Sequence, residues 1–467
     1  MTYDEAYEYI NRHGWSSNRN GFERSRRLLA ALGNPQKKLK FVHVAGTNGK
    51  GSTCAMLGAV LQRAGYTVGL FPSPFIEDFT ERIQVNGEHI SRDDMARLAQ
   101  TVADAADAME DHPLHFELIT AMGMLYFLEK GCDIVVLEVG MGGAHDATNV
   151  IDAPEVAVIC NIGLDHTEYL GDTVEEIAAV KAGIIKTGSD VVVYDNIPSV
   201  IEVIAAKARE QGCPLHLAFD IEITPVSSDL HGQVFTAVKT GISVTDDPDA
   251  ADASDVTGAS DATDSPDAPD ATAVPSAEHQ YSLSLLGRHQ LRNAQVALET
   301  IDVLRSRGWN ISEEAVTWGL ANVQWPVRFE VMGYDPVFII DGGHNPQCAQ
   351  AMAESIAEYL PNQKVTLVIG MLADKDYKTS IATILPYAAE CITITPDNSR
   401  RALPARELAE IIREYGCPAQ AVEADDPEEA AREAIRLAIS MKRPVVTWGS
   451  LYSAGTIRHC YREMMGR

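Results

Sequence analysis

Paired cysteines, long apolar runs and a basic amino-terminal stretch are all missing from this 467-residue sequence. Its eight cysteines are scattered and form no C-x-x-C pair, so neither a zinc ribbon nor a disulfide framework is indicated. The apolar runs have the length of a strand, short of the roughly 20 residues that a membrane helix needs. The first residues include acids where a secretory signal has bases. We therefore expect a cytoplasmic protein that does not span a membrane.

Basic residues are scarce: 38 Lys and Arg face 66 Asp and Glu, giving a formal net charge of -28. This charge argues against nucleic acid as the main partner. Nine of the Asp lie in residues 246–272, which contain no Lys or Arg. Such a segment cannot bury enough apolar surface to offset its ordering entropy. We predict a disordered surface insertion over about 246–276 without a catalytic role; an acidic docking tail is the alternative.

The remaining sequence alternates β-rich runs with helical patterns, which is typical of parallel sheets covered by helices. In the first part, strands are expected at 41–45, 68–71, 134–138, 156–160 and 191–194, with helices starting near Ser52, Ser91 and Thr173. After a helical stretch at 285–305, Trp325-Pro326 marks a break. A second series has strands at 337–340, 365–369, 391–395 and 445–448. We predict an α/β protein with one domain over 1–328 and a smaller, Rossmann-like α/β domain over 329–467.

The clearest functional signal is a glycine-rich turn between the first strand and the helix after it. The turn consists of Gly46, Thr47, Asn48, Gly49, Lys50, Gly51 and Ser52. Backbone N–H groups in such a turn form a nest for phosphate oxygens, and Lys50 supplies a charge for the β- and γ-phosphates. Gly51 separates the lysine from the hydroxyl residue, which departs from the common phosphate-loop spacing. A plain strand-to-helix turn is the alternative, but the lysine and the hydroxyl favour an ATP site.

Two further polar residues follow expected strands. Glu138 closes the strand at 134–138, and Asp165-His166 follows the strand at 156–160 by a few residues. Ligands gather at the carboxyl ends of strands in an open parallel sheet, so these side chains can reach a metal near the nucleotide. Alone, His166 would be a structural hydrogen-bonding residue; beside a phosphate loop, the group indicates magnesium.

These residues occur within a longer series of motifs. The series is Gly46 to Ser52, Ser73-Pro74-Phe75, 137–149, 161–169, 181–186, 286–294, 325–328, 341–346, 374–376 and 449–452. In this order the motifs resemble the folylpolyglutamate synthase/dihydrofolate synthase family of the Mur ligase superfamily. The resemblance covers nearly the whole chain except the acidic segment. It implies a P-loop ATPase domain of the Mur central-domain type, followed by a glutamate-binding domain.

The resemblance also implies a reaction. ATP phosphorylates a folate side-chain carboxylate, the amine of L-glutamate attacks the acyl phosphate, and ADP and phosphate are released. The implied nucleotide-binding residues are Gly46 to Ser52, Asn293, Arg328 and Asp341. Two Mg²⁺ sites are implied, with Ser73, Glu138, His166 and a carbamylated Lys181 as ligands. Lys50, Lys181 and His344 are the implied catalytic residues, and Ser450 joins His344 as a candidate for the glutamate pocket.

Two positions depart from the family pattern. Ala144 stands where many relatives carry arginine, which puts a pterin or metal-loop contact in doubt. Val327 replaces a usual glycine, with an expected effect on turn geometry only. Ala144 and the loop 73–76 favour a polyglutamate synthase over a bifunctional enzyme that also uses dihydropteroate, and relatives of this architecture suggest a monomer.

Other functions remain as alternatives. Lys181 taken alone reads as a solvated helix charge. A Mur-type ligase for a cell-wall nucleotide peptide would need an extra domain before the phosphate loop, for which about 45 residues leave no room. A non-enzymatic phosphate-loop switch would need the nucleotide site without Lys181, Asp341 and His344 in their motifs.

Overall fold

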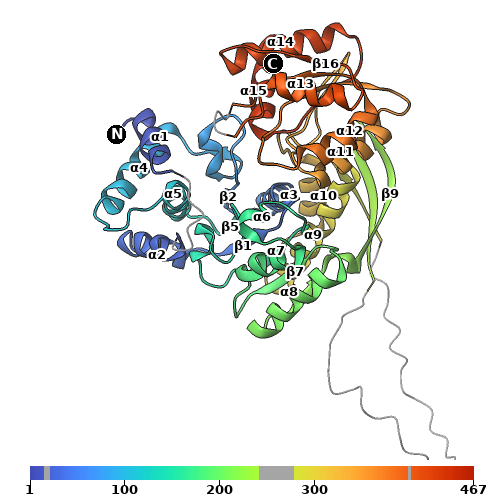
Figure 1. Cartoon of the computed structure of the whole chain (residues 1–467). Helices are drawn as coiled ribbons and strands as arrows, with labels where there is room; N and C mark the ends of the chain where they lie inside the picture. The colour runs from blue at the N-terminus through green and yellow to red at the C-terminus, as the bar shows by residue number, and fades with distance from the viewer. Residues whose placement is uncertain (15–20, 241–277, 398–400, 467) are drawn as a thin grey trace, which may run out of the picture.

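The computed structural model describes residues 1–14, 21–240, 278–397 and 401–466. The predicted insertion at 246–276 falls outside the described residues. Two α/β units are stacked on each other, and a small antiparallel sheet runs along one side (Figure 1). Within the described ranges, no helix has the length and apolar character needed to cross a membrane.

The first unit is built on an eight-stranded sheet with the order β4-β3-β2-β5-β1-β6-β7-β8, in which the pairs β2–β3 and β3–β4 are antiparallel and all others parallel. Its strands are β1 (Phe41–Ala45), β2 (Val68–Phe71), β3 (Gln84–Val85), β4 (Glu88–His89), β5 (Ile134–Glu138), β6 (Val156–Ile159), β7 (Asp190–Val193) and β8 (Leu215–Leu217). The predicted parallel sheet is confirmed, apart from the antiparallel edge.

Both faces of this sheet are covered, because successive side chains of a strand point to opposite faces. One face packs on α3 (Lys50–Arg63), α9 (Arg288–Ser306) and α10 (Glu313–Asn322). The other face packs on two groups of helices. They are α1 (Tyr3–Arg12), α2 (Gly21–Ala31), α4 (Arg92–Ala106) and α5 (His115–Glu129), then α7 (Val174–Lys181) and α8 (Pro198–Gln211). A short helix, α6 (Thr167–Leu170), precedes α7.

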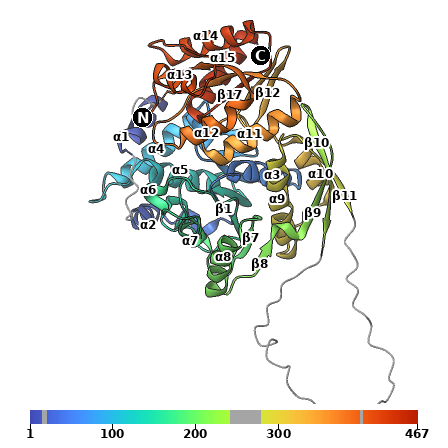
Figure 2. The ribbon, with the colours of Figure 1, turned by 45° about the vertical axis from the view of Figure 1, so that its right-hand side comes forward.

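The second unit has a six-stranded sheet with the order β12-β13-β17-β14-β15-β16, parallel except for the pair β12–β13. Its strands are β12 (Glu330–Tyr334), β13 (Val337–Ile340), β14 (Val365–Ile369), β15 (Ala388–Thr393), β16 (Ala419–Ala421) and β17 (Val445–Trp448). One face packs on α11 (Pro346–Tyr359), α12 (Tyr377–Ile384) and α13 (Ala405–Glu414), and the other on α14 (Pro427–Ser440) and α15 (Leu451–Met465). At the junction of the two units, α11 lies next to α9 (Figure 2).

A three-stranded antiparallel sheet was not predicted. It consists of β9 (Ile221–Asp229), β10 (Gly232–Lys239) and β11 (His279–Leu283), in the order β11-β10-β9. Phe235 and Tyr281 from this sheet join the core between the first sheet and α9. The small sheet therefore belongs to the packing of the first unit.

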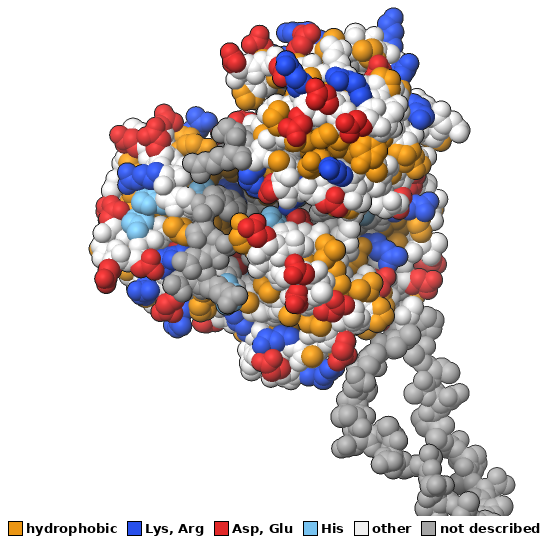
Figure 3. Space-filling model, viewed as in Figure 1, with side chains coloured by type: hydrophobic (Ala, Val, Ile, Leu, Met, Phe, Trp, Pro, Cys, Tyr) orange, Lys and Arg blue, Asp and Glu red, His pale blue; other side chains and the backbone are white. Residues whose placement is uncertain are grey.

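Charges of both signs are mixed over the face of the molecule shown in Figure 3, although acids are in excess in the sequence. This mixture leaves no large field of one sign on that face. Three of the charged residues predicted for the site, Glu138, Lys181 and Asp341, are buried.

A buried ion pair ties α2 to α5, and it yields a stability prediction. Arg24 donates from Nη2 and Nε to the two carboxylate oxygens of Glu117, at 2.8 and 3.0 Å, and both residues are buried. Replacing Arg24 by Met would leave the Glu117 carboxylate buried and unpaired, so we expect the free energy of unfolding to fall by about 3–5 kcal/mol. Urea unfolding followed by circular dichroism measures this loss.

The matched control is Arg26→Met on the same helix, because the Arg26 side chain is 62% exposed. An exposed pair contributes less than about 1 kcal/mol, so this variant should unfold nearly as the wild type does. Equal losses of unfolding free energy in the two variants would contradict the prediction that the buried Arg24–Glu117 pair stabilises the fold more than an exposed pair does.

Candidate active site

A pocket of about 460 Å³ lies where the carboxyl ends of strands from both large sheets meet. Every residue predicted for the catalytic, nucleotide or metal site lines it. These residues are Gly46, Thr47, Asn48, Gly49, Lys50, Gly51, Ser52, Ser73, Glu138, His166, Lys181, Asn293, Arg328, Asp341 and His344. The structure thus brings together side chains that are up to about 300 residues apart in the sequence. Their individual roles stay predictions.

The phosphate loop connects β1 to α3. The helix begins at Lys50 rather than Ser52, because Gly49 has φ 86° and turns the chain into the first helical residue. Only glycine adopts this conformation without strain. A side chain at Gly49 would also meet the Asn293 side-chain oxygen at 2.4 Å. The loop therefore presents its backbone N–H groups and the start of α3 to the pocket.

Two lysines share one carbonyl at the base of this loop. Lys50 Nζ donates to Gly46 O at 3.1 Å and to Thr47 O at 3.3 Å, and Lys181 Nζ donates to Gly46 O at 2.8 Å. Lys181 is 4% exposed. Burial, helped by the nearby Lys50 charge, lowers the pKa of Lys181 to about 7. A substantial fraction of Lys181 is therefore a neutral amine near neutral pH, unlike an ordinary surface lysine.

Glu138 is a buried carboxylate at the end of β5. Its Oε2 accepts a hydrogen bond from Ser73 N at 2.9 Å, and Ser73 Oγ accepts one from Arg82 Nη1 at 3.0 Å. Burial raises the pKa of Glu138, while the charge of Lys50 and the bond from Ser73 N oppose that rise. Arg82 was not predicted as a site residue, since an arginine in a loop carries no motif of its own.

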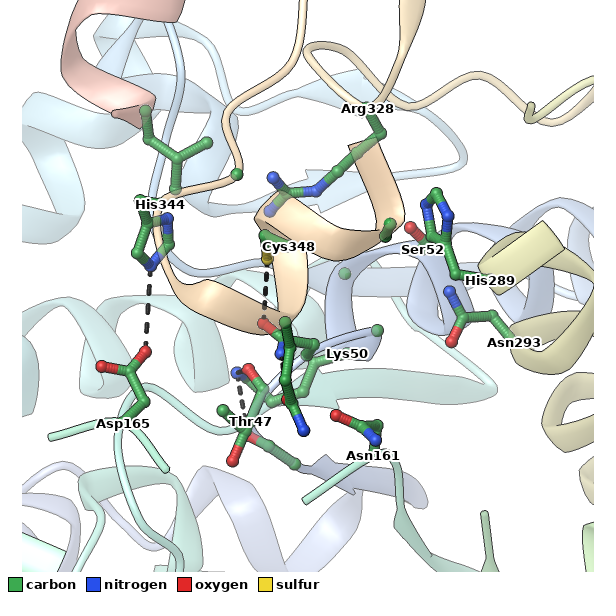
Figure 4. A pocket seen from close by; sticks show the side chains of 18 of the residues that line it. Thr47, Lys50, Ser52, Asn161, Asp165, His289, Asn293, Arg328, His344 and Cys348 are labelled. Carbon is green, nitrogen blue, oxygen red and sulfur yellow. Dashed lines mark hydrogen bonds and ion pairs between the residues drawn. The ribbon is translucent and has the colours of Figure 1, made fainter. Parts of the chain in front are cut away.

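A second charged cluster joins the two units at the other side of the pocket. Lys375 Nζ donates to Asp165 Oδ1 at 2.6 Å and lies 3.5 Å from His166 Nε2. His344 Nε2 lies 3.9 Å from Asp165 Oδ2 (Figure 4). Burial would raise the pKa of Asp165, but the Lys375 ammonium holds it below the ordinary value. Desolvation of the ring lowers the pKa of His166 to about 4 although the residue as a whole is exposed, so its ring is neutral at pH 7.

Asp341 organises the second unit's contribution. Its Oδ1 accepts from Gly343 N at 2.6 Å and its Oδ2 from Phe329 N at 2.9 Å. These bonds fix the turn that presents Arg328 to the pocket. Val327 has φ 54°, so the residue that replaces a usual glycine stands in the left-handed region, as expected for a turn that glycine would fit.

The phosphate loop also touches the second unit directly. Asn48 Nδ2 donates to Gln347 Oε1 at 2.8 Å, and Asn48 Oδ1 accepts from Asn345 Nδ2 at 3.1 Å. In Figure 4, His344 of the second unit faces Asp165 of the first, and Cys348 of the second unit points toward the phosphate loop. The Asn48 side chain therefore joins the phosphate loop to the second unit.

The donor set fits magnesium. Ser73 Oγ, the Glu138 carboxylate and the neutral His166 ring line the same pocket as the phosphate loop. Oxygen donors beside nucleotide phosphates suit Mg²⁺, which keeps much of its water and takes few protein ligands. The buried Glu138 carboxylate, which accepts a hydrogen bond from Ser73 N, is suited to a cation.

The structure also locates Ser450, a candidate for the glutamate pocket, and Ala144, which departs from the family pattern. Ser450 does not line the pocket: it is buried and caps α15 by accepting from Tyr452 N at 3.2 Å. Ala144 donates from its backbone N to Val180 O at 2.9 Å, and a side chain on Gly183 would meet its Cβ at 2.4 Å. The turn around Ala144 thus packs against the end of α7, next to Lys181.

Comparisons with known proteins agree with this architecture. The Mur ligase middle domain model matches residues 44–301, and the model of the Mur ligase, glutamate ligase domain matches residues 327–451. Fold and pocket therefore define a Mur-type, ATP-dependent glutamate ligase.

Full-length relatives give the family. A folylpolyglutamate synthase of Lacticaseibacillus casei is 32% identical, with 98% of each chain covered. A dihydrofolate synthase/folylpolyglutamate synthase of Bacillus subtilis is 33% identical, with 87% of this chain and 88% of the relative covered. A solved FPGS–AMPPCP–folate complex has a TM-score of 0.78 at 30% identity, covering 98% of this chain and 99% of that one. The chain belongs to the folylpolyglutamate synthase/dihydrofolate synthase family.

Proposed function

We propose that this protein adds L-glutamate to the γ-carboxylate of tetrahydrofolate and its polyglutamates, at the cost of one ATP. The observation that carries the proposal is the pocket in which the phosphate loop with Lys50, together with Arg328, meets Asp341 and His344 of the second unit. Family membership supports the same reaction. We place the domain boundary between Arg328 and Phe329, so that each domain supplies one side of the pocket.

The reaction takes place in two steps. The γ-phosphoryl group moves from ATP to a carboxylate oxygen of the folate side chain, which gives ADP and an acyl phosphate. The amine nitrogen of glutamate then attacks the carbonyl carbon, phosphate leaves, and the amine loses a proton. Lys50 and Arg328 supply positive charge to a transfer between two anions. The pocket between two domains limits access of water to the acyl phosphate.

We infer further that Ser73, Glu138 and His166 bind Mg²⁺, which would neutralise phosphate charge during the transfer. Lys181 is proposed to react with carbon dioxide at its neutral amine, forming a carbamate that serves as an anionic ligand for a second Mg²⁺. The lowered pKa of Lys181 supports this step, because only the neutral amine is a nucleophile.

The choice of glutamate acceptor is the sharpest test of the proposed function. Purified protein is given ATP, Mg²⁺ and labelled glutamate with either tetrahydrofolate or dihydropteroate as acceptor. We expect label in tetrahydrofolate. Label in dihydropteroate as well would establish the bifunctional alternative, which the Bacillus subtilis relative favours. Label in neither acceptor, from folded protein that binds ATP, would overturn the proposed function.

A further inference from the structure

The loop 73–82 of the first unit is seated on α15 of the second. The Ile76 side chain packs against the apolar cluster of the second unit that includes Phe338, Ala454 and Ile457. A Cβ on Gly455 would lie 2.1 Å from Ile76 O. The backbone of the loop thus approaches the helix so closely that only glycine fits at that position.

One guanidinium group, that of Arg458 on α15, bridges this loop to another segment. Arg458 Nη1 pairs with Glu77 Oε1. Arg458 Nε donates to Glu330 Oε2 at 2.8 Å, and Nη2 donates to Glu330 Oε1 at 3.0 Å. The Arg458 side chain is 17% exposed and that of Glu77 19% exposed, so solvent screens this cluster less than a surface ion pair.

Each of the two carboxylates belongs to a segment that lines the pocket. Glu330 Oε2 also accepts from Val327 N at 2.9 Å, next to the turn that presents Arg328. Glu77 lies four residues after Ser73, whose backbone N bonds Glu138. Arg458 therefore links the Ser73 loop to the turn that presents Arg328.

The loop is cross-linked internally, so a shift at Glu77 is passed on to Ser73. The Glu81 carboxylate accepts from the backbone N of Ile76 at 2.6 Å and from that of Glu77 at 2.9 Å. At the end of the loop, Arg82 Nη1 donates to Ser73 Oγ at 3.0 Å. These bonds join the part that contacts α15 to the part that faces the pocket.

We propose that Arg458 is a positioning residue for the ligase reaction, which holds the Ser73 loop and the Arg328 turn in register across the pocket through Glu77 and Glu330. Gly455 allows the close approach of the Ile76 backbone to α15. The inference rests on the proposed function. Arg458 does not line the pocket, so its effect on the reaction is exerted through the two segments that it joins.

The first test compares Arg458→Met and Arg458→Lys with wild type in ATP-dependent incorporation of labelled glutamate into tetrahydrofolate. Arg458→Met should lower kcat about 10–100-fold, because a misplacement of about 1 Å at a reacting centre has an effect of that size. Arg458→Lys should recover part of the loss, since lysine keeps the charge for Glu77. Arg462→Met, an exposed arginine on the same helix, is the matched control and should behave as wild type.

The second test changes the close contact between Gly455 and the Ile76 backbone without changing a charge. Gly455→Ala should push the Ile76 backbone away and lower kcat by a similar factor. Gly58→Ala, inside α3, is its control, because a Cβ added there meets nothing within 4 Å. Glu77→Gln combined with Arg458→Met should be no worse than Arg458→Met alone, since both changes break the same link.

The outcomes separate the two ideas. An inactive wild type would overturn the proposed function itself. An active wild type in which Arg458→Met and Gly455→Ala both keep normal kcat and KM would overturn the positioning role alone. Loss of thermal stability with unchanged kcat and KM would also overturn it, because the role would then be merely structural.

Discussion

Lys50→Ala should abolish most of the incorporation of labelled glutamate, with kcat lowered about 10²–10³-fold, the range found when one charge-stabilising donor is removed. Lys50 is the only lysine inside the glycine-rich turn, and its ammonium lies at the base of the loop, bonded to Gly46 O and Thr47 O. Without it, the charge that develops on the transferred phosphoryl group lacks a partner. Steady-state kinetics with tetrahydrofolate as acceptor measures the effect.

Lys38→Ala is the control for this variant, because Lys38 is exposed and does not line the pocket. Unchanged circular dichroism would show that Lys50→Ala is folded. Activity of Lys50→Ala within a few-fold of wild type would mean that the turn does not act on the phosphates in the proposed way.

Lys181→Ala and Lys181→Arg should each lower kcat about 100-fold, the upper end of the range for lost support of a metal site. Neither side chain can form a carbamate with carbon dioxide. A short carboxylic acid added to Lys181→Ala should restore part of the activity by placing a carboxylate in the space vacated. Wild-type activity in Lys181→Arg would contradict the carbamate, since arginine supplies only a cation.

The proposed carbamate also has a pH dependence of known sign. With a pKa of about 7, Lys181 is mostly protonated at pH 6 and mostly neutral at pH 8. Protein stripped of carbon dioxide and then given the same concentration of dissolved carbon dioxide should therefore regain activity slowly at pH 6 and faster at pH 8. Equal recovery at both pH values would argue against a reaction at this amine.

Much of the fold was predictable because local residue patterns indicate its strands and helix starts. The strands at 41–45, 68–71 and 134–138 match β1, β2 and β5 residue for residue, and Ser91 and Thr173 cap α4 and α7 with their side chains. Alternation of buried strands with helices leaves a strong period in the sequence. The strand predicted at 391–395 was placed late, since β15 is Ala388–Thr393.

The missed sheet shows where such reasoning fails. Residues 221–239 contain a proline and two serines, and the partner strand β11 follows only after the acidic segment. The two residues between β9 and β10, Leu230 and His231, are not a typical hairpin turn sequence, and no local signal connects β10 to β11. The pairing of β10 with β11 joins strands far apart in the sequence, which a local pattern cannot reveal.

The sequence predicted which residues line the site, but not the ion pairs and hydrogen bonds that connect them. Motif residues identified the pocket lining, whereas the ion pair of Asp165 with Lys375 and the links of Arg458 join residues more than 100 positions apart. Ion pairs between residues so far apart leave no spacing rule in the sequence. Ser450 illustrates the reverse case, because a residue inside a matched motif caps a helix instead of facing the pocket.

The pairing of β10 with β11 has a consequence for how this chain can vary. The register joins Gln233 to Leu283 and Ala237 to His279, and Phe235 and Tyr281 anchor the two strands in the core. The ends that flank residues 241–277 are thus brought together by the strands themselves. Since loop length enters the closure entropy only logarithmically, that connection can be lengthened, shortened or exchanged as a cassette while the ligase scaffold stays the same.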